Sequence, residues 1–384
     1  MQTTDINTQQ YDFKFNGEAT EYFKIWIINL CLTILTFGIY SAWAKVRTYR
    51  YFYGCTELDT HCFVYLADPV KILKGRIIAV FLLIVYSYIW NYVPAWRFIT
   101  LAAALSLLPV IIVIGSAFTL QNSSYRNIKF YFKRSYALAY RLFLTPLGIA
   151  LISAWVIYML VESSDFVSRM EHIKNSEFHR EDLVFTLFIM VVIPLIPYID
   201  YIRTRFLINQ SQFGNLEFSF HARTWDFYKI YLAGFVFLLG ASFFIGFSSG
   251  FVFALLASLK SKNITGISIA VITIIFYIFI FYISAFIRAQ RINLICKNTR
   301  FGENTFTARL RTGDIGWLYI SNAVGVVLSL GLLIPWAIIR MKRYTTESVS
   351  FIGANLSDIT EVNQQQSIAL GEELIDVFNI DIGF

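Results

Sequence analysis

Long apolar runs separated by short polar segments dominate the chain. The runs predict helices at residues 25–44, 77–93, 98–120, 142–161, 183–202, 228–258, 267–287 and 316–339. Most of them approach the ~20 apolar residues needed to cross a ~30 Å hydrocarbon core. The pattern predicts an all-α polytopic membrane protein with about eight hydrophobic segments.

Five short alternating segments precede apolar runs and divide the chain into repeated units. They begin near residues 13, 63, 130, 218 and 306, and the last three are 88 residues apart. In most of them aromatic residues stand at positions i and i+2, which places both rings on one face of an extended strand. We interpret these rings as anchors at the bilayer interface, where aromatic side chains are favoured.

The first and last apolar runs also repeat each other. Asn29, Gly38, Trp43, Ala44, Arg47, Arg50 and Tyr51 recur 293 positions later as Asn322, Gly331, Trp336, Ala337, Arg340, Arg343 and Tyr344. An Asn in a membrane helix usually bonds a neighbouring helix, whereas paired broken segments are how some transporters build binding sites. The candidate polar or broken-segment positions are therefore Asn29, Gly38, Asn322 and Gly331.

Basic residues predict the orientation of the central part. Loops 121–141, 203–229 and 288–314 are basic on balance and loop 162–182 is acidic, so the former face the cytoplasm and the latter the outside.

The two end runs conflict with this rule, because both sides of each match cytoplasmic segments. Two interpretations stay open. Either the chain makes eight full spans, or 25–50 and 316–343 are re-entrant, with breaks at Thr36-Phe37-Gly38 and Leu330-Gly331.

Three regions follow from these patterns. Residues 1–24 form a polar N-terminal segment, 25–343 the membrane domain, and 344–384 a tail with seven acidic residues and no Lys or Arg. Apolar spacing at 367–378 predicts a short amphipathic helix in the tail.

Composition agrees with a membrane protein. The chain is 57% hydrophobic and 15% charged, against about a quarter charged in soluble domains, and its mean hydropathy is +0.58. We attribute the net charge of +7 to the cytoplasmic loops and not to nucleic-acid binding. The four cysteines have no C-x-x-C spacing and predict neither a disulfide framework nor a zinc site.

We find no catalytic, cofactor-binding or metal-binding motif, and we expect the protein not to be an enzyme. The histidines lack ligand spacing, and the centres of the apolar runs hold no ionisable residue. Asp200 lies near an inner end beside Arg203 and Arg205, where we interpret it as an ion-pair partner.

Trp43 and Trp336 are each followed by arginines four and seven residues later. These arginines can hold anionic headgroups, at about 1 kcal/mol each. The candidate interfacial lipid contacts are Trp43, Arg47, Arg50, Trp336, Arg340 and Arg343. Membrane lipids are thus the predicted partners, and no protein partner is indicated.

Several segments resemble one known family. They are Phe13-Lys-Phe-Asn-Gly17, Leu32 to Arg47, Arg50-Tyr-Phe-Tyr53 and Asp381-Ile-Gly-Phe384. The chain resembles the YjgN-like family of bacterial inner-membrane proteins of unknown function, and departs from it at Cys55, where a polar residue is expected. The resemblance implies a multi-pass protein of the bacterial inner membrane and supplies no activity or ligand.

Three functional hypotheses remain. We prefer a non-catalytic membrane binding or accessory protein. The alternative is a transporter or channel for a small neutral or amphipathic solute, built on the two end segments. A lipid-acting enzyme would need a nucleophile or metal at headgroup depth, and the sequence offers none.

Overall fold

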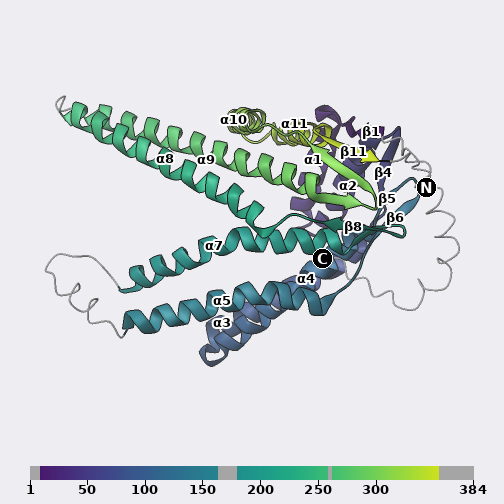
Figure 1. The fold of residues 1–384 in the computed structure, drawn as a ribbon, viewed down its shortest axis with the longest axis horizontal. Helices are drawn as coiled ribbons and strands as arrows, with labels where there is room; N and C mark the ends of the chain where they lie inside the picture. The colour runs from purple at the N-terminus through teal and green to yellow at the C-terminus, as the bar shows by residue number, and fades with distance from the viewer. Residues whose placement is uncertain (1–8, 163–179, 258–261, 354–384) are drawn as a thin grey trace, which may run out of the picture.

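The computed structural model describes residues 9–162, 180–257 and 262–353 (Figure 1). The helices are α1 (Ala19–Leu35), α2 (Ser41–Gly54), α3 (Pro69–Tyr92), α4 (Arg97–Gln121), α5 (Tyr136–Glu162), α7 (Arg180–Asn209), α8 (Thr224–Ala257), α9 (Lys262–Asn298), α10 (Thr312–Leu328) and α11 (Ile334–Glu347), with a 3-10 turn η1 (Pro94–Trp96). The strands are β1 (Gln9–Asp12), β2 (Lys14–Phe15), β3 (Thr56–Leu58), β4 (His61–Tyr65), β5 (Ser123–Tyr125), β6 (Ile128–Phe132), β7 (Ser211–Phe213), β8 (Leu216–Phe220), β9 (Thr299–Phe301), β10 (Asn304–Ala308) and β11 (Val349–Gly353).

The strands form one antiparallel sheet that closes on itself. Its order is β1-β11-β10-β9-β8-β7-β6-β5-β4-β3-β2. Only Phe13 separates the two end strands, and its N–H donates to the carbonyl oxygen of Val349 at 3.3 Å. Residues 9–15 are therefore one interrupted strand that pairs with β11 and then with β3, and a barrel results.

The barrel corrects the all-α expectation. Its strands are only two to five residues long and are separated by long helices, so helical composition outweighs them in the sequence. The alternating segments at the five unit starts are strands, but they alternate with the other strands in one sheet and do not lie separately at the bilayer surface.

The chain is a ring of five units. Each unit runs from a long strand through a helix pair to a second strand, called the short strand, which has three residues in units one to four and five in unit five. The helix pairs are α1–α2, α3–α4, α5–α7, α8–α9 and α10–α11. The last helix of each unit packs on the first helix of the next, and α11 packs on α1. Figure 1 shows the barrel at one end of the molecule and the long helix pairs extending away from it.

Aromatic rings fill the barrel and the seams between units. The first ring of each long strand packs with buried residues of the short strands, which are Leu58, Tyr125, Phe213, Phe301 and Phe351. The second rings, Phe15, Tyr65, Phe132 and Phe220, are buried where neighbouring units meet. The interpretation of these pairs as interfacial anchors is therefore wrong. The second rings are buried, and the first rings are partly buried against the barrel core. Full burial of one such side chain contributes about 1.5–3 kcal/mol.

Six of the described helices, α3 to α9, are long and apolar enough to cross a membrane. Each end run is instead divided between two shorter helices. At 17 and 14 residues, α1 and α2 are about 25 and 21 Å long, and α10 and α11 have the same lengths.

The boundaries of the end regions also shift. Residues 9–15 belong to the barrel, and α11 and β11 extend the folded region to Gly353. The amphipathic helix expected at 367–378 lies outside the described residues.

Candidate functional site

The candidate positions of the two end runs lie in two helical hairpins, α1–α2 and α10–α11. Both hairpins break at the predicted places. Phe37 and Gly38 have φ of 50° and 91°, and Leu330 and Gly331 have φ of 52° and 92°. Each glycine N–H donates to a carbonyl five residues earlier at 2.8 Å, as in a Schellman helix end.

Hydroxyl groups complete the turns. Thr36 Oγ1 accepts from the N–H of Tyr40 at 2.9 Å, and Ser329 Oγ accepts from the N–H of Leu333 at 3.0 Å. These bonds pair backbone groups that a helix end leaves exposed. Pairing of this kind lowers the cost of irregular backbone at membrane depth, where unpaired polar groups are costly.

The two asparagines hold their hairpins together. Asn29 and Asn322 are 6% and 9% exposed. Asn29 Nδ2 donates to the carbonyl oxygen of Ala44 at 3.5 Å, and Asn322 Nδ2 donates to that of Ala337 at 3.3 Å. Each bond joins the two helices of its own hairpin, and the two asparagines do not converge on one site.

The arginine and tryptophan candidates differ between the copies. Arg340 donates to Asn322 Oδ1 at 2.9 Å and to Ser321 Oγ at 3.0 Å, and it stacks 4.4 Å from the centre of the Trp336 ring. In the first copy Arg47 is exposed, and Trp43 stacks on Tyr40. Only Arg47 of this pair is therefore directed outward.

The second arginine pair links neighbouring units. Arg343 donates to the carbonyl oxygen of Gly17 at 2.8 Å, and Arg50 donates to that of Ala67 at 3.4 Å. Both acceptors lie two residues after a long strand of the barrel. Arg50 and Arg343 are exposed as well, so contact with headgroups stays a prediction for them.

A tyrosine closes the base of each hairpin. Tyr51 accepts from the N–H of Glu18 at 2.8 Å and donates to its carbonyl oxygen at 2.9 Å. Tyr344 accepts from the N–H of Arg311 at 2.9 Å. Burial raises the pKa of the Tyr51 phenol to about 12, which keeps this donor protonated.

The hairpin tips are apolar and uncovered. Phe37 and Leu330 are 99% and 95% exposed. Further exposed apolar side chains surround them, namely Ile34, Leu35, Ile39, Val327, Leu328 and Leu332. Such patches on a protein surface mark contact with a membrane or a partner.

Sequence reasoning found Asp200 but gave it the wrong partner. Its Oδ2 accepts from Arg291 Nε at 2.6 Å and from the Tyr231 hydroxyl at 3.1 Å. Since these residues lie on α7, α8 and α9, the ion pair joins units three and four. A pair 91 residues apart has no local signal, and we assign it a structural role.

No metal centre occurs in the described part of the chain, since no three His, Cys, Asp or Glu side chains gather there. The four cysteines are free thiols, and none forms a disulfide within the described ranges. His172 and His179 lie outside those ranges.

Comparison with known proteins identifies relatives but no activity. Residues 10–377 match the family model described as "Bacterial protein of unknown function (DUF898)". The chain is 29% identical over 122 residues to "Inner membrane protein YjgN" of Salmonella typhimurium, covering 32% of this chain and 31% of that protein. It is 36% identical over 61 residues to "Inner membrane protein YjgN" of Escherichia coli K12, covering 16% and 15%. No solved structure matches.

Proposed function

The chain belongs to the DUF898 family of bacterial proteins of unknown function, and from this premise we propose that it binds an amphipathic component of the bilayer without catalysis. It is a multi-pass membrane protein, and relatives that carry the name inner membrane protein assign it to the bacterial inner membrane. The observation that carries the proposal is the pair of short hairpins side by side in a ring of otherwise full spans.

Both hairpins begin and end at the barrel. α1 follows β2 and α2 leads into β3, while α10 follows β10 and α11 leads into β11. We infer that the hairpins enter the bilayer from the barrel side and turn back within it. Their apolar tips and paired backbone groups support this, because exposed tips of this composition would be unfavourable in water.

An opening toward the lipid follows from this arrangement. The ring runs α9, α10–α11, α1–α2, α3, and the middle four helices are too short to reach the far side. The ring is thus complete near the barrel and open toward the bilayer beyond the hairpin tips. An amphipathic molecule can enter such a space laterally, with its polar end toward the basic loops.

A transporter or channel is the weaker alternative. An axial path would have to pass the barrel, whose interior is filled by the aromatic cluster around Phe213 and Phe301. The asparagines that would form a midplane site bond their own hairpins. These contacts favour binding over conduction.

Lipid analysis tests the proposal. The full chain is purified in a mild detergent, and the retained amphiphiles are compared with the bulk membrane by mass spectrometry. We expect at least one class to be enriched near or above one molecule per chain. Retention in the proportions of the bulk membrane would refute amphiphile binding.

Depth measurements test the re-entrant hairpins separately. A nitroxide is attached at Phe37→Cys or Leu330→Cys in a variant whose native cysteines are serines. Both tips should collide with membrane-soluble oxygen and not with an aqueous nickel chelate. Glu303→Cys, in the exposed β9–β10 turn, is the aqueous control. Nickel accessibility at both tips equal to that control would contradict the arrangement.

A further inference from the structure

We propose that unit four carries a site for one anionic phospholipid, with the acyl chains in a groove along α8 and the headgroup beside the barrel. The inference rests on the proposed function and names the ligand class and the place.

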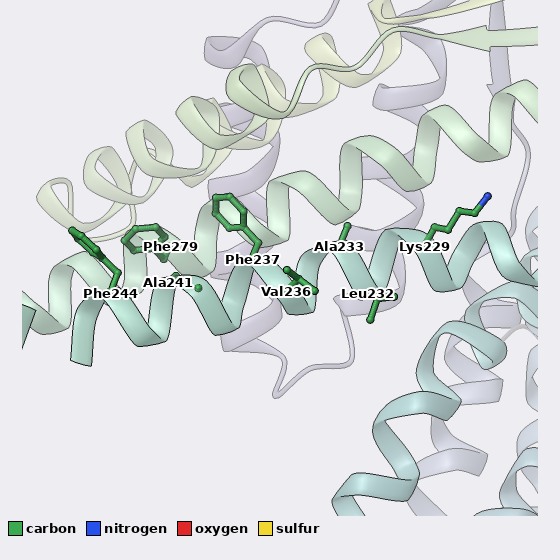
Figure 2. A pocket seen from close by; sticks show the side chains of 9 residues that line it. Lys229, Leu232, Ala233, Val236, Phe237, Ala241, Phe244 and Phe279 are labelled. Atoms are coloured by element: carbon green, nitrogen blue, oxygen red, sulfur yellow. The ribbon is translucent and has the colours of Figure 1, made fainter. Parts of the chain in front are cut away.

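The groove follows one face of α8. It has a volume of about 700 Å³, and its apolar lining includes Leu232, Val236, Phe237 and Phe244, with Phe279 from α9. Figure 2 shows these side chains in a row, with Lys229 at the end nearer the barrel and Phe244 at the other. Lys229 and Phe244 are 15 residues apart, or about 22 Å along the helix, which exceeds the ~15 Å depth of one hydrocarbon leaflet.

A second pocket of about 590 Å³, with charged side chains in its lining, adjoins the groove at Lys229, which lines both. Lys229, Lys297 and Arg309 supply three positive charges to its lining, and Asp226 one negative charge. An excess of positive charge beside an apolar groove is complementary to a phosphate attached to acyl chains.

The cations are available for a ligand. Lys229 lies 3.7 Å from Asp226, but the two side chains are 63% and 31% exposed, and such pairs contribute little. Lys297 and Arg309 are exposed. The nearby Asn293 is instead occupied, because its amide group exchanges two hydrogen bonds with the backbone of Leu310.

The depth of the pocket fits a headgroup. Trp225, which is 59% exposed, stacks on Tyr228 one turn before the groove begins. Exposed Trp and Tyr side chains mark the level of the headgroups. Loops 203–229 and 288–314, which flank the pocket, are basic and therefore cytoplasmic. The site thus faces the cytoplasmic leaflet.

Native mass spectrometry of the full chain with added palmitoyl-oleoyl phosphatidylglycerol tests the headgroup contacts. K229Q/K297Q/R309Q should raise the concentration for half-occupancy roughly 10- to 100-fold, as expected for three cations near a headgroup. K129Q/K133Q/R300Q removes the same charge from exposed residues outside the pocket and should leave it within about twofold. Equal effects of the two triple variants would overturn the site.

A second variant tests the groove. Gly240→Leu places a side chain where a Cβ has no neighbour within 4 Å, so we expect the fold to persist while the groove fills. Binding of phosphatidylglycerol should fall at least tenfold. Gly246→Leu, on the same helix, also in open space and outside the groove lining, should bind as before. A Gly240→Leu variant that binds normally would overturn the groove.

The outcomes separate this site from the general proposal. If both site variants bind phosphatidylglycerol as the unchanged chain does, while the purified protein still retains an enriched amphiphile, only this site is wrong. If no amphiphile is enriched, the proposed function fails. The mass spectra also show whether a species with the mass of two chains forms. If this dimer is present in the unchanged protein and absent in Gly240→Leu, the groove is a self-association surface and the lipid site is overturned.

Discussion

The two terminal hairpins share one backbone but pair their polar groups differently. Gly38 and Gly331 have nearly the same φ, and Asn29 and Asn322 each bond a carbonyl 15 residues later. In the second hairpin Arg340 also bonds the asparagine oxygen. In the first, Asn29 Oδ1 is buried without a hydrogen-bond partner among the described residues.

This difference separates the residues that the hairpin fold requires from those that are free to differ between the two copies. Both copies keep the glycine, the asparagine and the tyrosine at the base, because each satisfies a condition of the turn or of the helix pair. Arg47 and Arg340 occupy equivalent positions, yet one is exposed and the other is held by Asn322 and Trp336. The repeated motif is therefore explained by the hairpin fold and does not require a ligand.

The largest difference in stability between equivalent substitutions is expected at the seams on either side of the first hairpin. Ile339 is 3% exposed and packs with Phe15 and Tyr22, which closes the ring. Val46, its equivalent, is 3% exposed in the seam to unit two. Ile339→Ala should destabilise the protein by about 2–5 kcal/mol and Val46→Ala by about 1–2 kcal/mol, since one fewer side-chain carbon is lost.

Thermal unfolding in detergent measures both changes, with Ile338→Ala, 36% exposed on the same helix, as the control. Amide exchange should quicken in β1 and β11 in Ile339→Ala only. Unchanged exchange there would mean that the barrel closes without this contact.

Substitution of the two asparagines by leucine should change the free energy of unfolding by unequal amounts. Asn322→Leu removes two hydrogen bonds and leaves Arg340 without its amide acceptor, so it should cost about 2–3 kcal/mol. Asn29→Leu loses one long bond and removes an unpaired buried oxygen, so the free energy of unfolding should change by less than about 0.5 kcal/mol.

A double-mutant cycle identifies the cause. Arg340→Met should recover part of the loss in Asn322→Leu, because no guanidinium then lacks its amide acceptor. Similar costs for the two asparagine variants would show that the pairing with Arg340 contributes nothing.

Much of this architecture could be predicted from the sequence. The six central spans, the five unit starts and the breaks at Gly38 and Gly331 all leave local signals in hydropathy or in residue type. The matching of the two end runs also predicted that the two ends have equivalent structures. The choice between eight spans and re-entrant segments stayed open, because charge alone does not show where a helix turns back.

The closed barrel was missed although a signal exists. Four short strands begin with Ser or Thr, and these are Thr56, Ser123, Ser211 and Thr299. Each hydroxyl donates to the carbonyl four residues earlier, at the end of the preceding helix. A Leu or aromatic residue follows two positions later and enters the barrel core. Each of these strands forms a local hairpin with the next strand and also pairs with the strand that opens its own unit. Only this second, long-range pairing joins the hairpins into a barrel, and it leaves no local signal.

The two hairpin glycines should show the smallest difference between the two copies. Gly38 and Gly331 have φ of 91° and 92°, a region that costs an L-residue about 1–2 kcal/mol. A Cβ meets nothing within 4 Å at Gly38 and only an ordinary 3.6 Å contact at Gly331, so conformation alone sets the cost.

Gly38→Ala and Gly331→Ala should therefore lower the free energy of unfolding equally, by about 1–2 kcal/mol each. Gly54→Ala and Gly313→Ala, where a Cβ also meets open space and φ is not in the left-handed region, are the matched controls and should be neutral or slightly stabilising. A cost confined to one hairpin would mean that the two turns are not equivalent. The two hairpins would then share a sequence motif without sharing the backbone conformation of the turn.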